Sequence, residues 1–224
     1  MLTPVTLQGN LICLEPMTTD HAQDLYSAAL EERSTYSYTN VPDSLESAKR
    51  YIDEALRAYE NGRALPFVVR HLETGRIIGS TRFLDLDVFK WPPPWPPGAS
   101  SGPVPSDENP PTVAEIGSTW YAASFQRTGV NTECKLLMLT HAFDTWHSIR
   151  VTLKTDARNE RSRAAIQRLG AAFEGIRRAH IPATDGGIRD TAYYSILENE
   201  WHAVRSNLQE RLQRGMKITA DEKL

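Results

Sequence analysis

Cysteine is scarce in this sequence, and its scarcity excludes two classes of protein. Only Cys13 and Cys134 occur, far apart and outside any CxxC pair. A disulfide-stapled scaffold needs several pairs, and a thiolate zinc site needs clustered ligands. His141 and His147 lie six residues apart, whereas a metal-binding pair on a helix is spaced by four. We therefore expect a reduced protein that holds no metal.

Long apolar runs and an excess of one charge are also lacking. No stretch approaches the roughly 18 apolar residues that a membrane span needs. Residues 1–14 lack the basic start and the apolar run of a signal peptide. The net charge is only −3, whereas nucleic-acid binders usually carry a basic excess. These absences predict a cytoplasmic protein that contacts neither a membrane nor nucleic acid directly.

Proline is unevenly distributed along the chain. The chain has 224 residues and 14 prolines, and most of these prolines fall within residues 91–111. Proline cannot donate a backbone hydrogen bond and disfavours helix at the preceding residue, so an irregular loop is expected there. We interpret the segment as an insertion in a single domain that spans residues 1–224; a linker between two domains is the alternative. Trp91 and Trp95 in this loop could form a lid, dock a partner or anchor the loop.

The rest of the sequence alternates between strand and helix patterns, which indicates an α+β protein. Strands are expected at residues 11–15, 65–72, 76–86, 113–121, 150–155, 172–181 and 189–197. Helices are expected at about 20–30, 44–62, 131–146 and 159–169, and a tail helix opens the segment 198–224. The predicted order is β-α-α-β-β-β-α-β-α-β-β-α, and the proline-rich segment falls between the third and fourth strands.

Two helices carry further signals. Asp20 is expected to cap the first helix, with Gln23 three residues on completing a capping box. The tail helix has an apolar stripe at Trp201, Val204, Leu208 and Leu212. This stripe could pack on its own domain or on a second copy, so a homodimer is a possible partner.

The segment 115–133 has the pattern of a phosphate-binding turn. Strand 113–121 runs into a turn at 125–129, and a long helix follows. The first N–H groups of such a helix have no partner and carry partial positive charge, which suits a phosphate. Gly129 would let the backbone approach that phosphate, and Arg127 would add charge. The turn matches neither the GxxxxGK[ST] nor the GxGxxG motif. The alternative interpretation is therefore that the turn only connects the strand to the helix.

Two blocks of sequence resemble a known family. Gln126-x-x-Gly129-x-Asn131 is similar to the [QR]-x-x-G-x-[GA] acetyl-CoA pyrophosphate motif of the GNAT N-acetyltransferase superfamily. Residues 155–171 are similar to its fifth strand, Asn-bearing loop and fourth helix. The resemblance covers roughly residues 8–200 without the proline insertion and is nearest to the RimJ/RimL branch of protein N-terminal alanine acetyltransferases. It implies the GNAT fold, a mixed and mostly antiparallel twisted sheet flanked by helices.

The resemblance also implies a co-substrate and a reaction. Acetyl-CoA would lie between the fourth and fifth strands, and a primary amine of a protein N-terminus or small molecule would attack it directly in a ternary complex. The implied cofactor contacts are Trp120, Tyr121, Ala122, Gln126, Arg127, Thr128, Gly129, Val130, Asn131, Thr132, Asn159 and Ser162.

Catalytic roles follow from the same resemblance. Glu115 is the candidate base, Ser162 would face the leaving thiolate, and Tyr193 or Tyr194 would supply an acid. Each has a plainer interpretation. Glu115 could pair with a nearby arginine, Ser162 is ordinary in a first helical turn, and only one of two adjacent tyrosines can face the cleft. Asn159 could simply cap its helix.

The sequence departs from the family pattern at two positions. Asn131 stands where the motif has Gly or Ala, and Ile166 stands where many members carry a tyrosine acid. The missing tyrosine motivates an alternative function, a non-catalytic acyl-CoA-binding module. A further alternative is a resistance enzyme for aminoglycoside-like amines, for which Asp85 and Asp87 are the only hint.

Some positively charged and thiol side chains have open assignments. Arg158, Arg161 and Arg163 could meet the 3′-phosphate of CoA, or could form ion pairs on the surface. Cys134, next to the phosphate turn, is interpreted as a small buried filler rather than a reactive thiol.

Overall fold

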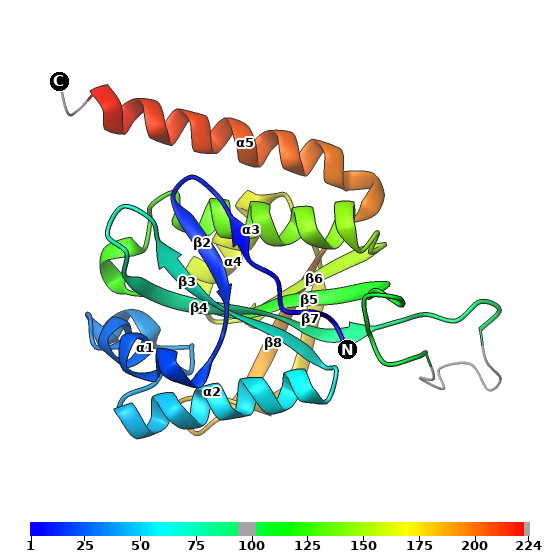
Figure 1. The fold of residues 1–224 in the computed structure, drawn as a ribbon, viewed down its shortest axis with the longest axis horizontal. Coiled ribbons are helices and arrows are strands. Elements are labelled where there is room, and N and C mark those ends of the chain that lie inside the picture. The colour runs from blue at the N-terminus through cyan, green and yellow to red at the C-terminus, as the bar shows by residue number, and fades with distance from the viewer. Residues whose placement is uncertain (94–101, 222–224) are drawn as a thin grey trace.

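The structure is a computed structural model that describes residues 1–93 and 102–221. In these residues, eight strands form one sheet in the order β1-β2-β3-β4-β5-β6-β8-β7 (Figure 1). The strands are β1 Leu7–Gln8, β2 Ile12–Pro16, β3 Ala64–His71, β4 Ile77–Asp87, β5 Val113–Tyr121, β6 Arg150–Asp156, β7 Ala172–Pro182 and β8 Ile188–Leu197. All neighbouring strands are antiparallel except β5 and β6, which run parallel.

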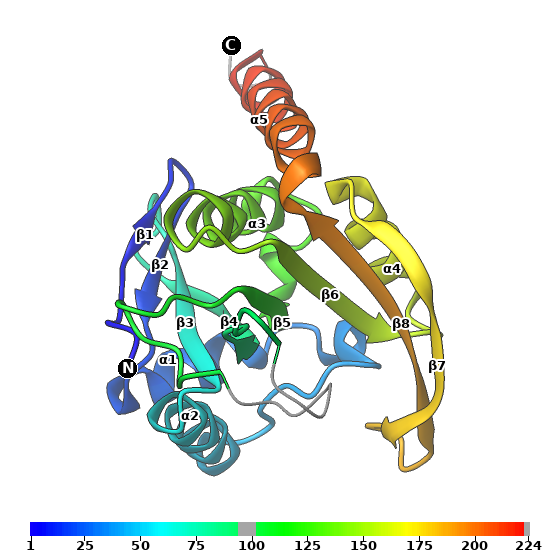
Figure 2. The same cartoon turned by 90° about the vertical axis from the view of Figure 1, so that its right-hand side faces the viewer.

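Helices cover both faces of the sheet. They are α1 Ala22–Ala29, α2 Leu45–Glu60, α3 Val130–Thr140, α4 Glu160–Leu169 and α5 Glu198–Asp221. Helices α1 and α2 lie on one face, α3 and α4 lie on the other, and α5 lies outside α3 (Figures 1 and 2). The order of elements is the predicted one, with the short strand β1 added. No helix in the described part of the chain is long and apolar enough to cross a membrane.

Each face of the sheet has its own apolar core. The larger core joins the sheet to α3, α4 and α5, and the smaller one joins it to α1 and α2. Strand β3 is buried over residues 64–69 because both faces are covered there. Helix α2 begins as predicted, since the Ser44 Oγ accepts a hydrogen bond from the Ser47 N–H at 3.1 Å.

The predicted cap of the first helix is wrong. A short 3₁₀ turn at Thr19–His21 precedes α1, and its N-cap is Thr18. The Thr18 N–H donates to His21 Nδ1 at 3.0 Å, so His21 takes the role expected of Gln23. Asp20 lies inside this turn and is exposed. A capping pattern in sequence cannot distinguish neighbouring hydroxyl and carboxylate caps two residues apart.

The long helix expected at 131–146 is present but changes type. Its last part is a π-helix at His141–Thr145, in which the Trp146 N–H donates to the His141 carbonyl at 3.0 Å. The wider turn places the His141 ring against Trp146, with ring centroids 4.6 Å apart. Residue spacing predicted the helix and could not reveal the extra residue in the turn.

The apolar stripe of α5 packs on its own chain. Trp201, Val204 and Leu208 belong to the larger core, and Leu212 is also buried. The indole N–H of Trp201 donates to Asp144 at 2.8 Å, which fixes α5 near the end of the α3 region. The stripe is therefore covered without a second copy, and the homodimer stays a prediction.

The proline-rich segment lies between β4 and β5. Its described parts, residues 91–93 and 102–111, contain neither helix nor strand. Trp91 is 77% exposed, whereas Trp95 lies outside the described residues.

Candidate functional site

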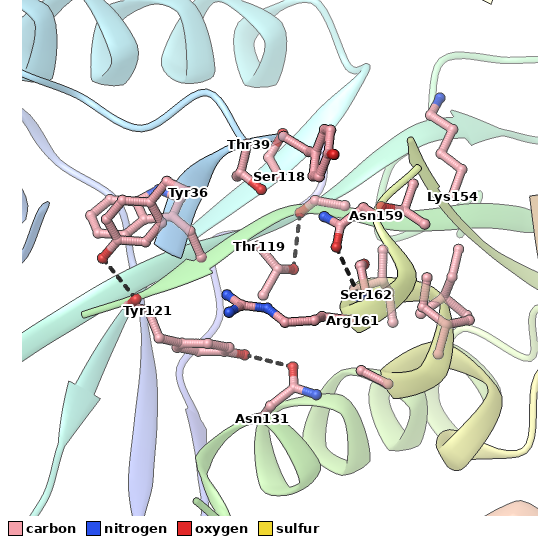
Figure 3. A pocket seen from close by; sticks show the side chains of 18 of the residues that line it. Tyr36, Thr39, Ser118, Thr119, Tyr121, Asn131, Lys154, Asn159, Arg161 and Ser162 are labelled. Atoms are coloured by element: carbon pink, nitrogen blue, oxygen red, sulfur yellow. Dashed lines mark hydrogen bonds between the residues drawn. The ribbon is translucent and has the colours of Figure 1, made fainter. Parts of the chain in front are cut away.

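The parallel pair of strands opens a cleft in the sheet. Strand β5 pairs with β6 only over Val113–Glu115, and beyond this point β6 stays paired with β8. Strand β5 continues to Tyr121 along β4, so its other edge has no strand partner in the described structure. A cavity of about 1380 Å³ lies at this divergence and is lined from β5, β6, α2, α3 and α4 (Figure 3). The unpaired backbone edge can therefore hydrogen-bond a ligand.

A bulge redirects β5 at the cavity. Ser118 and Thr119 together oppose Thr81 of β4, and Ser118 has a φ of 48°. Such bulges end regular pairing and re-aim side chains. Ser118 and Thr119 both line the cavity as a result (Figure 3).

Lys135 is a buried cation beside this bulge that the sequence reasoning missed. Its Nζ donates to the Thr119 Oγ1 at 2.7 Å, and burial lowers the pKa of its ammonium group. The available signal was its position, because Lys135, Met138 and Leu139 share one face of the helix. A lysine on the apolar face of a helix is unusual unless its charge serves a site.

The turn before α3 is arranged differently from the prediction at one residue. Arg127 adopts the left-handed conformation with a φ of 61°, whereas Gly129 has an ordinary φ of −66°. A Cβ at Gly129 would lie 2.8 Å from Leu11, so this glycine admits the neighbouring β1–β2 turn and does not line the cavity. The close contact with Leu11 gives Gly129 a structural reason, and its approach to a phosphate stays a prediction.

The start of α3 nonetheless faces the cavity. Gln126, Arg127, Thr128, Asn131 and Thr132 all line it, whereas Ala122 and Val130 are buried beside it. The first-turn N–H groups of a helix have no acceptor within the helix. The cavity wall here combines these donors with five cationic side chains: Arg127, Lys135, Arg161, Arg168 and Arg211. This end of the cavity is suited to a polyanion.

Side-chain hydrogen bonds hold this wall in place. The Gln126 amide donates to the Tyr121 carbonyl and to Thr35 Oγ1, both at 3.0 Å. The Tyr36 hydroxyl donates to the same Tyr121 carbonyl at 2.9 Å, and the Tyr121 hydroxyl donates to Asn131 at 3.3 Å (Figure 3). Gln126 therefore helps to hold the turn, and its contact with the cofactor stays a prediction. Asn131 gains a contact that Gly or Ala would lack.

Helix α4 supplies the opposite wall. The Asn159 Oδ1 accepts a hydrogen bond from the Ser162 N–H at 3.0 Å, so its capping role is confirmed. Asn159, Ser162 and Ile166 all line the cavity. Figure 3 shows Asn159 and Ser162 facing the same space as Ser118 and Thr119. Capping and ligand contact are thus compatible for Asn159.

Glu115 is buried and paired with a lysine rather than with the arginine that the sequence analysis considered. Its side chain is 4% exposed, and its Oε2 lies 2.6 Å from the Nζ of Lys154. Lys154 also contacts Asp85 at 3.2 Å. Burial raises the pKa of Glu115 to about 7, although Lys154 acts in the opposite direction. A carboxyl group with this pKa can accept a proton near neutral pH.

The two tyrosines of β8 lie on opposite faces, as expected. Tyr194 is fully buried, and its hydroxyl accepts a hydrogen bond from Arg163 at 3.0 Å. Tyr193 is half-buried and its hydroxyl lies 3.4 Å from His180 Nε2, but Tyr193 does not line the cavity. Ser162 is therefore the better-placed hydroxyl of the predicted candidates.

Of the three arginines proposed for the 3′-phosphate, only Arg161 lines the cavity. Arg158 pairs with Asp156 at 2.8 Å and with Asp185 at 2.6 Å. Arg163 is engaged with Tyr194. Arg168 and Arg211, which the sequence analysis did not select, line the cavity instead. Cys134 is fully buried, and burial raises the pKa of its thiol, which agrees with a filler role.

Comparisons with known proteins agree with this geometry. Residues 12–172 match the family described as "Acetyltransferase (GNAT) domain". The Bacillus subtilis (strain 168) protein named "Putative ribosomal N-acetyltransferase YdaF" is 36% identical over 88 residues, which is 39% of this chain. That match spans 47% of the relative, about half its length.

Solved structures share the fold. A GCN5-related N-acetyltransferase from Brucella melitensis is 26% identical with a TM-score of 0.76, covering 94% of this chain and 86% of that one. Mycobacterium smegmatis RimJ, in complex with CoA-disulfide, is 19% identical with a TM-score of 0.65, covering 89% of this chain and 88% of that one. The family model covers well over half of the sequence, and we conclude that the chain belongs to the GNAT acetyltransferase family.

Proposed function

We propose that this protein is an acetyl-CoA-dependent N-acetyltransferase that acts on a primary amine. The observation that carries the proposal is the divergence of β5 from β6, which leaves an open backbone edge facing the start of α3. Membership in the family and the CoA-bound state of the RimJ structure support the choice of co-substrate.

The described residues fit acetyl-CoA in three ways. The open edge of β5 offers hydrogen bonds to the amides of the pantetheine arm. The first turn of α3 offers N–H groups and the positive end of a helix dipole to the diphosphate. The cationic side chains around it, including Arg161 and Lys135, balance the phosphate charge. When bound, acetyl-CoA would supply an activated thioester.

The protein's own groups then manage protons and positions. Glu115, with a pKa of about 7, takes a proton from the acceptor ammonium, directly or through water. The Ser162 hydroxyl, on the opposite wall, donates a hydrogen bond to the departing sulfur. Asn159 and the β5 edge hold the two reactants in line, and such positioning lowers the barrier of a direct transfer. We assign Tyr193 no more than an indirect part, because it lies outside the cavity wall.

The acceptor class follows the relatives. The name of the Bacillus subtilis relative contains "ribosomal N-acetyltransferase", and the RimJ structure is a fold neighbour. We therefore propose a protein N-terminal amine as acceptor, with a small-molecule amine as the alternative. We also propose that residues 1–224 act as one domain and that the reaction takes place in the cytoplasm.

The binding site is tested by placing a negative charge at the start of α3. Thr132→Glu adds a carboxylate where Thr132 lines the cavity, and an acid in the first turn of a helix favours the helix itself. We expect this variant to fold normally and to lose acetyl-CoA affinity by at least about tenfold in calorimetry. Gln167→Glu adds the same charge on the exposed side of α4, outside the cavity wall, and should bind like the wild type. Equal affinities for both variants would contradict the proposed site.

One observation favours a second function. Ile166 is buried and lines the cavity at the position where many relatives carry a tyrosine acid. A protein without that acid could bind acyl-CoA and transfer nothing. Release of CoA thiol with a panel of N-terminal peptides and amines distinguishes the two functions. Binding without release on every acceptor would favour the non-catalytic module.

A further inference from the structure

Arg82 is a buried cation in the cavity wall that the proposed reaction does not use. It is 8% exposed and lines the cavity on the face of β4 that α2 covers. Its guanidinium carbon lies 4.2 Å from the centre of the Tyr51 ring, and one terminal nitrogen donates to the Tyr51 carbonyl at 3.3 Å. The guanidinium is therefore held against Tyr51 of α2.

The other donors of Arg82 have no hydrogen-bond acceptor among residues 1–93 and 102–221. Its Nε is buried and has no hydrogen-bond partner, and no carboxylate lies within 4 Å of it among the described residues. A buried charge without a counter-ion is costly, so a partner from outside the chain would stabilise it. The planar fork of arginine matches the two oxygens of a carboxylate.

The position of Arg82 relative to Glu115 limits the distance between the anionic group and the amine of that ligand. Arg82 pairs with Gly117 across β4 and β5, and Leu84 pairs with Glu115. Arg82 and Glu115 are thus diagonal neighbours on one face, with Cα atoms roughly 7–8 Å apart. A Cβ at Gly117 would lie 2.6 Å from Glu115 Oε1, so only glycine leaves room for the carboxyl group there. An amine held near Glu115 and an anion held by Arg82 would therefore be separated by about the length of one amino acid.

The charges at this end of the cavity favour the same ligand. Arg189 also lines it and forms no ion pair with another described residue, whereas the acids Asp85 and Asp87 do not line it. Glu115 and Asp85 both contact Lys154, and Glu54 of α2 is a further acid that lines the cavity. A polycationic acceptor such as an aminoglycoside would meet Arg82 and Arg189 here, whereas Glu115 and Asp85 are already paired with Lys154.

We propose, on the basis of the function proposed above, that the acceptor amine carries a carboxylate that Arg82 binds. The acceptor is then either an amino acid, through its α-carboxylate, or a peptide N-terminus with an acidic side chain. In both cases Arg82 binds the anion while Glu115 faces the amine. Arg82 thus selects the acceptor and takes no part in proton transfer.

The test compares acceptors that differ only in charge. Peptides with a C-terminal amide and either Glu or Gln at the first position report on a side-chain carboxylate. Free alanine and alaninamide report on an α-carboxylate. We expect the acidic member of one pair to have a kcat/KM about 10- to 100-fold higher with the wild-type protein. Arg82→Gln should bring this ratio close to one, and Arg82→Lys should give an intermediate ratio.

Controls separate acceptor recognition from folding and cofactor binding. Arg178→Gln removes an exposed arginine outside the cavity and should keep the wild-type ratio. The acetyl-CoA affinity and the melting temperature of Arg82→Lys should stay near those of the wild type. A ratio near one in the wild type, or an unchanged ratio in Arg82→Gln, would overturn the proposal.

A binding measurement keeps the proposal testable if no acceptor is acetylated. That result would count against the proposed enzymatic function alone. Calorimetry with the CoA-loaded protein would then compare the N-acetylated Glu and Gln peptides and, for the other source, N-acetylalanine and its amide. Tighter binding of an acidic product that is lost in Arg82→Gln supports the role of Arg82. Equal binding within both pairs overturns it.

Discussion

Glu115 shows at the residue scale how burial and an ion pair compete. Burial favours the protonated carboxyl group, and Lys154 at 2.6 Å favours the carboxylate. Burial is the larger effect, and the pKa of Glu115 rises to about 7. The residue is consequently divided between acid and base forms at neutral pH. Lys154, which the sequence analysis did not select, is the residue that keeps this pKa from rising further.

The pH dependence of activity should report this balance. Glu115 acts in its ionised form, so kcat/KM should rise with pH through about 7. Lys154→Met removes the cation that favours the carboxylate, and the rise should move upward by about one pH unit or more. Glu115→Gln should abolish the rise and lower kcat by about 10²–10⁴-fold. The acceptor amine also ionises, and this adds a second pH-dependent part to the kcat/KM profile. Neither variant should change that part. Coincident profiles for Lys154→Met and the wild type would remove Lys154 from this role.

At the scale of elements, short contacts join segments that are distant in sequence. Glu133 of α3 is 3% exposed and accepts hydrogen bonds from the N–H groups of Asn10, Leu11 and Ile12 at 2.7–2.9 Å. These bonds fix the β1–β2 turn against the start of α3, where Gly129 admits Leu11. The helix end that faces the cavity is therefore held from behind by the N-terminal turn.

Helix α4 allows its capping role and its ligand role to be separated. Asn159→Asp retains an oxygen that caps the helix, but it adds negative charge to the cavity wall. We expect unchanged thermal stability and an acetyl-CoA affinity lowered several-fold. Asn159→Ala removes the cap and should lower the free energy of unfolding by about 1 kcal/mol. Thermal unfolding and calorimetry on the same samples measure both effects. Full cofactor affinity in Asn159→Asp would show that Asn159 is only a cap.

At the scale of the whole molecule, the distribution of charge differs from the net charge. The chain carries a net charge of −3. One end of the cavity is nevertheless lined by cationic side chains from α3, from the turn before α3, and from α4 and α5. Helix α5 contributes Arg211 to this wall while its apolar stripe completes the larger core. The tail helix thus has a structural part and a part in the site.

Cofactor affinity should therefore depend on salt. Raising the ionic strength from about 0.05 M to 0.5 M screens the attraction between the cationic wall and the phosphates. We expect the dissociation constant of acetyl-CoA to rise several-fold over this range. Dephospho-CoA, which lacks the 3′-phosphate, should show a smaller dependence. Titrations of both molecules at three salt concentrations provide the measurement, and identical dependence would place the 3′-phosphate away from these cations.

The sequence by itself determined the order of elements, the family and the segments that border the cavity. It did so because local signals suffice for these features: apolar periodicity, glycine at helix ends and a motif contained within six residues. The tertiary structure alone decided the pairing of Glu115 with Lys154, the burial of Lys135 and the contact of Gly129 with Leu11. It also decided that Arg82 lies diagonal to Glu115 with no carboxylate within 4 Å among the described residues. These contacts join separate strands and helices, and the residue types involved occur equally well on a solvated surface. Their roles depend on which neighbours the sheet brings within hydrogen-bonding distance.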